Sequence, residues 1–148
     1  MTAPPAIVST TGAFDQGSEI QLAPFEDDAS LRGAFGKALT EAFRENDVQV
    51  SGDGQLIADF ALAERNAQSG VADPAASSSE NVIWTSQPRD RGLLDRCDAR
   101  RVRATLVILD RASGEVTYRG VAEASDCAID DEHITALARA LVADARTD

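Results

Sequence analysis

Aromatic residues and histidine are scarce in this 148-residue chain, which has one Trp, one Tyr, five Phe and one His. Of its residues 43% are hydrophobic, many of them alanine, so the core must be built from Leu, Ile, Val and the few Phe. The single histidine, His133, restricts hydrolytic chemistry, because a Ser-His-Asp or Cys-His site would have to use it. No Gly-x-Ser-x-Gly turn is present. These scarcities predict a protein that is not an enzyme.

Long apolar runs are also missing, since no stretch of about 18 apolar residues could form a membrane-spanning helix. The first five residues show no basic region followed by an apolar signal core. We expect them to begin a mature segment from which a signal peptide, ending at a lipid-bearing cysteine, has been removed. The alternative is a cytoplasmic protein with two free thiols.

Positive charge is in short supply, with 14 basic against 25 acidic side chains and a net charge of −11. General binding of nucleic acid needs a positive field that displaces counterions, so this balance argues against it. The same balance disfavours adsorption to anionic lipid. We expect no nucleic-acid partner, and contact with a membrane only through the removed lipid anchor.

Only two cysteines occur, Cys97 and Cys127, and they lie at the two ends of a predicted β-hairpin. The turn residues 112–114 lie almost midway between them. Folding the chain there brings the two cysteines within about one or two positions of each other, near the reach of a disulfide. A disulfide would place the protein in an oxidising compartment.

Hydrophobic spacing predicts an α+β fold, with an antiparallel β-sheet of four to five strands and two helices packed on one face. The helices are predicted from apolar residues at 3.6-residue spacing, and the strands from alternation and turn residues. The predicted helices cover residues 31–43 and 130–145, and the predicted strands cover 18–25, 48–50, 55–64, 102–109 and 115–124. Residues 81–85, around Trp84, are a candidate for a further short strand. Gly33 and Gly36 weaken the first helix by about 1 kcal/mol each, which suggests that another element packs closely there.

The domain organisation follows from composition. Residues 1–17 are rich in Pro, Thr, Ser and Gly without periodicity, so they are interpreted as a flexible leader or tether. Residues 18–146 are expected to form a single α+β domain. Small polar residues at about 66–81 predict a mobile loop within it.

His133 lies in an acidic run with Asp130, Asp131 and Glu132. Carboxylates and imidazole are suitable metal ligands, so a metal-dependent enzyme is one hypothesis for this run. The structural alternative is that Asp130 caps the last helix while the next two acids complement its dipole. Adjacent helix positions do not converge on one point, so we expect no metal and no cofactor.

The arginine-rich segment is the main candidate for partner binding. Six of the 14 basic residues fall within fifteen positions, and three interleaved aspartates reduce their local net charge to +3. Arginine pairs bidentately with carboxylate and phosphate, so a recognition surface is one interpretation; the other is pairing with acids elsewhere on the chain. Trp84 is a second candidate, as an interface anchor or as a core residue. The candidate arginines are Arg89, Arg91, Arg96, Arg100, Arg101 and Arg103.

The predicted hairpin resembles the end of small Gram-negative envelope lipoproteins of unknown function. Residues 104–122, ATLVILDRASGEVTYRGVA, are similar to that family's Leu-x-Ile-x-Leu-x-Asp-x-x-Thr/Ser-Gly-x-x-Val/Leu-Trp-Arg-Gly-x-Ala pattern, with Tyr118 in place of the usual Trp. A terminal helix follows in both, and Leu56 to Phe60 is similar to the family's middle portion. The family usually lacks the cysteine pair and the arginine-rich insert. The resemblance implies a lipid-anchored, periplasm-facing domain without catalytic residues.

These observations lead to the hypothesis of a non-enzymatic periplasmic domain that binds another envelope component or protein. The alternative is a small-molecule or lipid-binding domain with a pocket between the sheet and the helices. A deep apolar cavity in that layer would favour the alternative.

Overall fold

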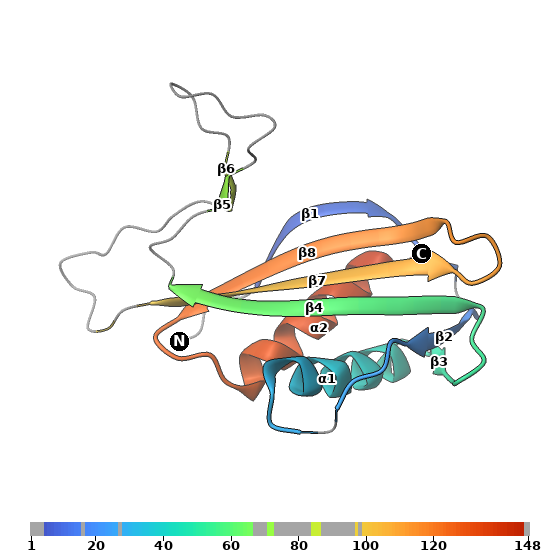
Figure 1. Ribbon diagram of the computed structural model, residues 1–148, viewed down its shortest axis with the longest axis horizontal. Helices are drawn as coiled ribbons and strands as arrows, with labels where there is room; N and C mark the ends of the chain where they lie inside the picture. Colours follow the sequence, from blue (N-terminus) through green and yellow to red (C-terminus); the bar gives the residue numbers. More distant parts are fainter. Residues whose placement is uncertain are drawn as a thin grey trace.

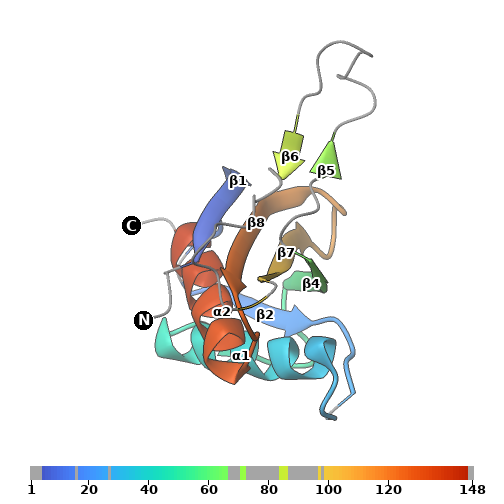
Figure 2. The same cartoon turned by 90° about the vertical axis from the view of Figure 1, so that its left-hand side faces the viewer.

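β-branched and aliphatic residues in the second half of the chain form the centre of a six-stranded sheet, and two helices cover one of its faces (Figures 1 and 2). This computed structural model describes residues 5–15, 17–26, 28–66, 71–72, 84–86, 97 and 99–146. The elements, in chain order, are β1 (Ala6–Gly12), β2 (Glu19–Leu22), α1 (Leu31–Glu45), β3 (Gln49–Val50), β4 (Leu56–Asn66), β5 (Val71–Ala72), β6 (Trp84–Ser86), β7 (Arg100–Asp110), β8 (Val116–Asp126) and α2 (Asp131–Ala145).

The strand order of the sheet is β1-β8-β7-β4-β2-β3. The α+β architecture with both helices on one face agrees with the sequence prediction, but the sheet has six strands and is mixed. Strands β1, β8, β7 and β4 are antiparallel neighbours, whereas β2 runs parallel to both β4 and β3. The parallel pairs arise because α1 carries the chain from β2 back to the start of β3 and β4, as parallel pairing requires.

Strand β1 lies in the segment that the sequence analysis assigned to a leader. It pairs with β8 from Ala6 to Gly12 and forms an edge of the sheet. All seven of its residues are exposed, so neither face of the strand requires apolar residues at alternate positions, and its sequence shows no such alternation. An edge strand without a buried face leaves no periodic signal, which is why composition suggested a flexible segment.

The β7–β8 hairpin confirms the clearest prediction. The two strands pair from Arg100 opposite Asp126 to Leu109 opposite Val116. At the turn, the backbone N–H of Gly114 donates to the Asp110 carbonyl at 2.8 Å, and Gly114 has a φ of +74°. Glycine adopts this conformation without a steric penalty.

Helix α1 contains two glycines because neighbouring chain lies against them, as the sequence analysis suggested. A Cβ added at Gly36 would lie 2.6 Å from Cγ of Phe25, and one added at Gly33 would lie 2.5 Å from the carbonyl oxygen of Glu26. The segment between β2 and α1 therefore packs directly on the helix. The helix begins after Ser30, whose hydroxyl accepts a hydrogen bond from the Gly33 N–H at 3.0 Å.

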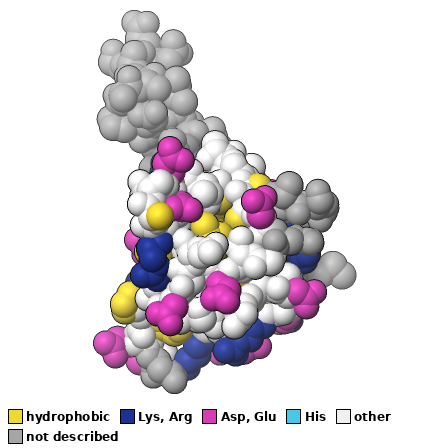
Figure 3. Space-filling model, turned by 90° about the vertical axis from the view of Figure 1, so that its right-hand side faces the viewer, with side chains coloured by type: hydrophobic (Ala, Val, Ile, Leu, Met, Phe, Trp, Pro, Cys, Tyr) yellow, Lys and Arg dark blue, Asp and Glu magenta, His cyan; other side chains and the backbone are white. Residues whose placement is uncertain are grey.

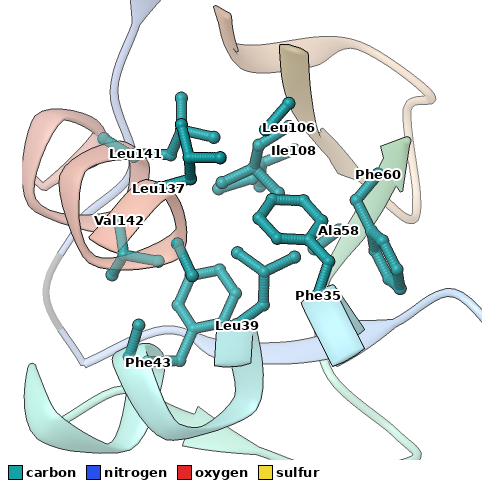
Figure 4. Close-up of a cluster of buried hydrophobic side chains, with 14 of the residues drawn as sticks. Phe35, Leu39, Phe43, Ala58, Phe60, Leu106, Ile108, Leu137, Leu141 and Val142 are labelled. Carbon is teal, nitrogen blue, oxygen red and sulfur yellow. The ribbon is translucent and has the colours of Figure 1, made fainter. Parts of the chain in front are cut away.

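The core fills the layer between the helices and the sheet (Figure 4). Side chains from α1, β4, β7 and α2 point toward one another there, and the predicted inner face of the last helix is the buried one. The labelled core residues are Phe35, Leu39, Phe43, Ala58, Phe60, Leu106, Ile108, Leu137, Leu141 and Val142.

The predicted loop at about 66–81 lies mostly outside the described residues. Within it, β4 continues to Asn66, and β5 pairs with β6 as a separate two-stranded ribbon. In the described part of the chain, no helix combines the length and the apolar character needed to cross a membrane. Acidic side chains are spread over the end of the molecule that carries the β7–β8 turn, and the hydrophobic areas on that face are small (Figure 3).

Candidate functional site

Three arginines and one glutamate gather on the face of the sheet opposite the helices, which we call the outer face. Alternation along β4, β7 and β8 puts buried residues on the helix side and their neighbours on the outer face. In the register of the sheet, Arg65 pairs with Arg101, and Arg103 pairs with Glu123. We call these four residues the arginine cluster.

The three guanidinium groups surround one carboxylate. Arg65 Nη2 lies 3.8 Å and Arg103 Nη1 3.8 Å from Glu123 Oε1, while Arg101 Nε lies 3.9 Å from Glu123 Oε2. Among these four residues, three positive charges face one negative charge, on a chain whose net charge is −11. The arginine cluster therefore gathers arginines at one place on an acidic protein.

Partial burial strengthens the electrostatic field of the cluster, because less water screens its charges. The side chains of Arg65 and Arg103 retain 22% and 24% exposure, and that of Glu123 retains 13%. Burial and the neighbouring positive charges of Arg101 and Arg103 lower the pKa of the Arg65 guanidinium, and the Glu123 carboxylate opposes that shift. Arginine nonetheless stays protonated in proteins, so the cluster keeps its charge at every physiological pH.

Hydrogen bonding in the cluster is incomplete. Arg103 Nη1 and Glu123 Oε1 are both buried atoms, and neither has a hydrogen-bond partner in the described structure. The 3.8 Å between them is too long for a hydrogen bond. Arg101 Nε donates to Ser125 Oγ at 3.3 Å. Within the described structure, Arg103 Nη1 is thus an unsatisfied donor in a side chain that is 24% exposed.

The structure divides the six predicted arginines. It brings Arg101 and Arg103 together on the outer face, whereas Arg100 lies at the start of β7 on the other face and pairs with Glu64, Nε to Oε1, at 3.0 Å. The interpretation that these arginines pair with acids of the chain therefore holds for Arg100. Arg89, Arg91 and Arg96 lie outside the described residues. Trp84 begins β6, and the structure describes only its backbone.

The sequence analysis missed Arg65 and Glu123, which complete the cluster. Arg65 is 36 positions before Arg101 in the sequence, and Glu123 is in the returning strand of the hairpin. The hairpin turn fixes the pairing of Arg103 with Glu123, so that contact was available from the sequence. The pairing of β4 with β7, which brings Arg65 to the cluster, could not be predicted from the sequence, because no local turn joins these two strands.

The predicted disulfide between Cys97 and Cys127 is present, with the two Cα atoms 5.7 Å apart. It joins the chain just before β7 to the residue after β8, across a sequence separation of 30. In the chain-entropy account, closing a loop of that length stabilises the fold by about 3–4 kcal/mol. The bond also holds together the two strands that carry most of the arginine cluster.

His133 is a buried structural residue at the start of α2. Its Nδ1 lies 2.6 Å from Asp130 Oδ1, and its Nε2 lies 3.0 Å from Asp126 Oδ2. Burial disfavours the charged ring, but the hydrogen bonds that the ring donates to the Asp130 and Asp126 carboxylates, together with their charges, outweigh burial, so the pKa of His133 is raised. Asp130 also accepts from the His133 N–H at 3.1 Å, which makes it the helix cap that the structural alternative predicted.

Both ring nitrogens of His133 are engaged by these carboxylates. In the described part of the chain, no group of three His, Cys, Asp or Glu residues is placed to hold a metal ion.

Tyr118, the residue that stands in the place of the family's Trp, is buried on the helix side of β8. Its hydroxyl donates to Asp144 Oδ2 of α2 at 2.8 Å, and Thr10 of β1 donates to the same oxygen at 2.5 Å. Burial and the Asp144 hydrogen bond raise the pKa of Tyr118. A Cβ at Gly120 would collide with the Tyr118 phenol, so the Tyr-x-Gly pair of the motif lets the ring lie along its own strand. The motif residues therefore have a packing role.

No protein-family model matches the chain. No curated protein matches it. Among solved structures, the fold is similar to that of the PelC dodecamer from Paraburkholderia phytofirmans, with a TM-score of 0.58 at 10% identity, covering 97% of this chain and 99% of that chain. A PDZ domain protein from Parabacteroides distasonis gives a TM-score of 0.52 at 10% identity, covering 95% of this chain and 36% of that chain.

A minor lipoprotein from Acinetobacter baumannii gives a TM-score of 0.40 at 16% identity, covering 86% of this chain and 84% of that chain, which is too distant to support an argument. The first two likenesses show that this two-layer fold occurs in proteins of very different sequence. At such low identities they show the fold alone.

Proposed function

We propose that this chain is a non-enzymatic periplasmic domain that binds an acidic segment of another envelope protein through the outer face of its sheet. One observation carries the proposal: Arg65, Arg101 and Arg103, on the neighbouring strands β4 and β7, gather around the single carboxylate of Glu123 on the outer face. Partly desolvated arginine is typical of the energetically important residues of protein interfaces. A carboxylate side chain offers the planar, bidentate partner that arginine prefers.

The disulfide supports the choice of compartment. Structural disulfides persist in the periplasm and in secreted proteins, and they are rare in the reducing cytosol of most bacteria. The hairpin resemblance to envelope lipoproteins points to the same compartment. The fold is shared with a protein that assembles, the PelC dodecamer, which is compatible with a binding role.

The alternative of a small-molecule pocket between sheet and helices has less support. Buried side chains from α1, β7 and α2 fill that layer, among them Leu39, Leu106 and Leu137, each with no exposed area (Figure 4). Two surface depressions lie instead on the helices, one of about 750 Å³ between α1 and α2 and one of about 640 Å³ beside α2. Charged residues, including Glu132 and Arg139, line these open depressions, so they do not match the predicted apolar cavity.

Site-specific photo-crosslinking in cells tests which face binds the partner. A photoreactive amino acid replaces Ala61, which is exposed on the outer face of β4, and in a matched variant it replaces Lys37, which is exposed on α1. We expect a crosslinked protein partner with the label at position 61 and none with the label at position 37. Adducts from position 37 alone would contradict the proposal, as would the absence of adducts from both positions.

A further inference from the structure

In the part of the chain that the structure describes, strand β1 is an edge of the sheet. It hydrogen-bonds to β8 on one side only, and each of its seven residues is exposed. Its sequence, AIVSTTG, has no charged residue and no proline, although the whole chain carries a net charge of −11. Proteins usually protect an edge of this kind with lysine, proline or a covering segment. An exposed, uncharged, β-branched edge therefore indicates a surface that another strand covers.

The backbone of β1 has free hydrogen-bonding groups along this edge. The Ala13 N–H donates to the Thr117 carbonyl at 2.9 Å, and Gly12 lies opposite Tyr118. In an antiparallel pair, alternate residues bond to the partner strand while the residues between them point their N–H and C=O groups away from it. Thr10 and Gly12 therefore direct their backbone groups outward.

Two exposed hydrophobic side chains, Ile7 and Val8, belong to the same edge strand. In the described part of the chain, the exposed large hydrophobic residues are Ile7, Val8 and Val116, at 37%, 39% and 58% exposure. Two of them belong to β1, and Val116 begins β8 two residues before Tyr118, the partner of Gly12. The edge thus offers apolar contacts beside its free backbone groups.

We propose that the occupant of this edge is β1 of a second copy of the chain, paired antiparallel, so that the two sheets join in a twofold dimer. The seven residues of β1 carry no charge, so the paired strands themselves oppose no like charges, whereas the acidic remainder of the surface repels a second copy. The opposite edge, β3, has only two residues, Gln49 and Val50, and is too short to pair with β1 in a head-to-tail chain. Pairing of β1 with itself closes the assembly at two copies.

A β-bulge in β1 limits the length of edge that can pair regularly, and with it the strength of the proposed contact. The register of β1 on β8 shifts between Ile7 and Ser9, so that Val8 is the extra residue. A bulge bends the strand and interrupts regular pairing. The regular part of the edge is then Ser9–Gly12, and we expect a reversible dimer whose population rises with concentration.

Sedimentation equilibrium of the full chain over a range of concentrations tests the proposal. We expect a monomer–dimer equilibrium that approaches twice the chain mass of 15.7 kDa. Thr11→Glu places like charges across the middle of the proposed contact and should abolish the dimer at concentrations where the unaltered chain is dimeric; within one copy the new carboxylate lies opposite Arg119 of β8. Gln49→Glu is the matched control, because it adds the same charge to the exposed opposite edge. It should leave the dimer intact.

Hydrogen exchange of the unaltered chain provides a second measurement that needs no variant. The outward N–H of Thr10 should become protected from exchange as the protein concentration rises. A monomer at every concentration would overturn the proposal, and so would a dimer that survives Thr11→Glu or dissociates with Gln49→Glu. Assemblies larger than two copies would also overturn it. The arginine cluster is not part of this contact, so either proposal can fail without the other.

Discussion

Tyr118 and Gly120 of β8 depend on each other for their packing. The Tyr118 ring occupies the space that a side chain at position 120 would need, and Leu141 Cδ2 lies 3.0 Å from the same point. We predict that Gly120→Ala lowers the free energy of unfolding by about 1–3 kcal/mol, as forced overpacking of a core does. Gly52→Ala is the matched control, because nothing lies within 4 Å of a Cβ at that position. It should change the stability by less than about 0.5 kcal/mol. Urea denaturation measures both.

A double-mutant cycle tests the cause of that loss. The Tyr118 hydroxyl is the atom nearest to the added Cβ, so Gly120→Ala should cost less in a Tyr118→Phe background. If Gly120→Ala lowers the free energy of unfolding equally in both backgrounds, the Tyr118 hydroxyl is not the reason why position 120 requires glycine.

His133 gives the protein a pH-dependent contribution to stability. Because Asp130 and Asp126 raise its pKa above the ordinary value of 6.5, the folded state binds the proton more tightly than the unfolded state does. The stabilisation is complete below pH 6.5 and is lost as the pH rises through the folded pKa. We predict that the difference in unfolding free energy between the unaltered chain and His133→Gln shrinks over that range. A difference that is constant from pH 5 to pH 9 would contradict this account.

At the scale of elements, α1 depends on the segment that precedes it. Alanine normally stabilises a helix interior by about 1 kcal/mol relative to glycine. At Gly36 the added Cβ would meet the ring of Phe25, which also packs edge-on against Phe60 with centroids 5.8 Å apart. We predict that Gly36→Ala destabilises the chain in thermal unfolding, and that the same change stabilises a Phe25→Ala variant. The same sign in both backgrounds would show that α1 does not need glycine for close packing.

The elements that the sequence predicts best are those whose signal is local. The inner face of α2 follows from apolar residues at helical spacing, and the β7–β8 hairpin follows from its turn at Gly114. The disulfide follows from the same turn, because it lies midway between the two cysteines.

Other features depend on contacts that are distant in the sequence. Edge strand β1 has no buried face to produce a pattern, and the parallel pairing of β2 with β4 depends on how α1 folds back. The contacts within the arginine cluster also include one that is local in the sequence and one that is not. Arg103 and Glu123 are brought together by the hairpin turn, whereas Arg65 reaches them only through the pairing of β4 with β7.

At the scale of the whole molecule, charge is distributed unevenly. The chain carries a net charge of −11, yet the outer face holds three arginines around one glutamate. The two faces of the sheet and its β1 edge differ in the side chains that they present. One face is covered by helices, the outer face holds the arginine cluster at one end, and the β1 edge is uncharged. The proposed acidic partner and the proposed second copy of the chain would therefore contact different parts of the sheet.

The most direct test of the central claim is the affinity of the crosslinked partner, once purified, for two charge-reversal variants. Arg103→Glu alters the arginine cluster, and Arg44→Glu alters an arginine that is 61% exposed on α1. Isothermal titration calorimetry should show at least about tenfold weaker binding for Arg103→Glu, which corresponds to about 1.4 kcal/mol. Arg44→Glu should bind as the unaltered chain does. Equal affinity of the two variants would contradict binding through the arginine cluster.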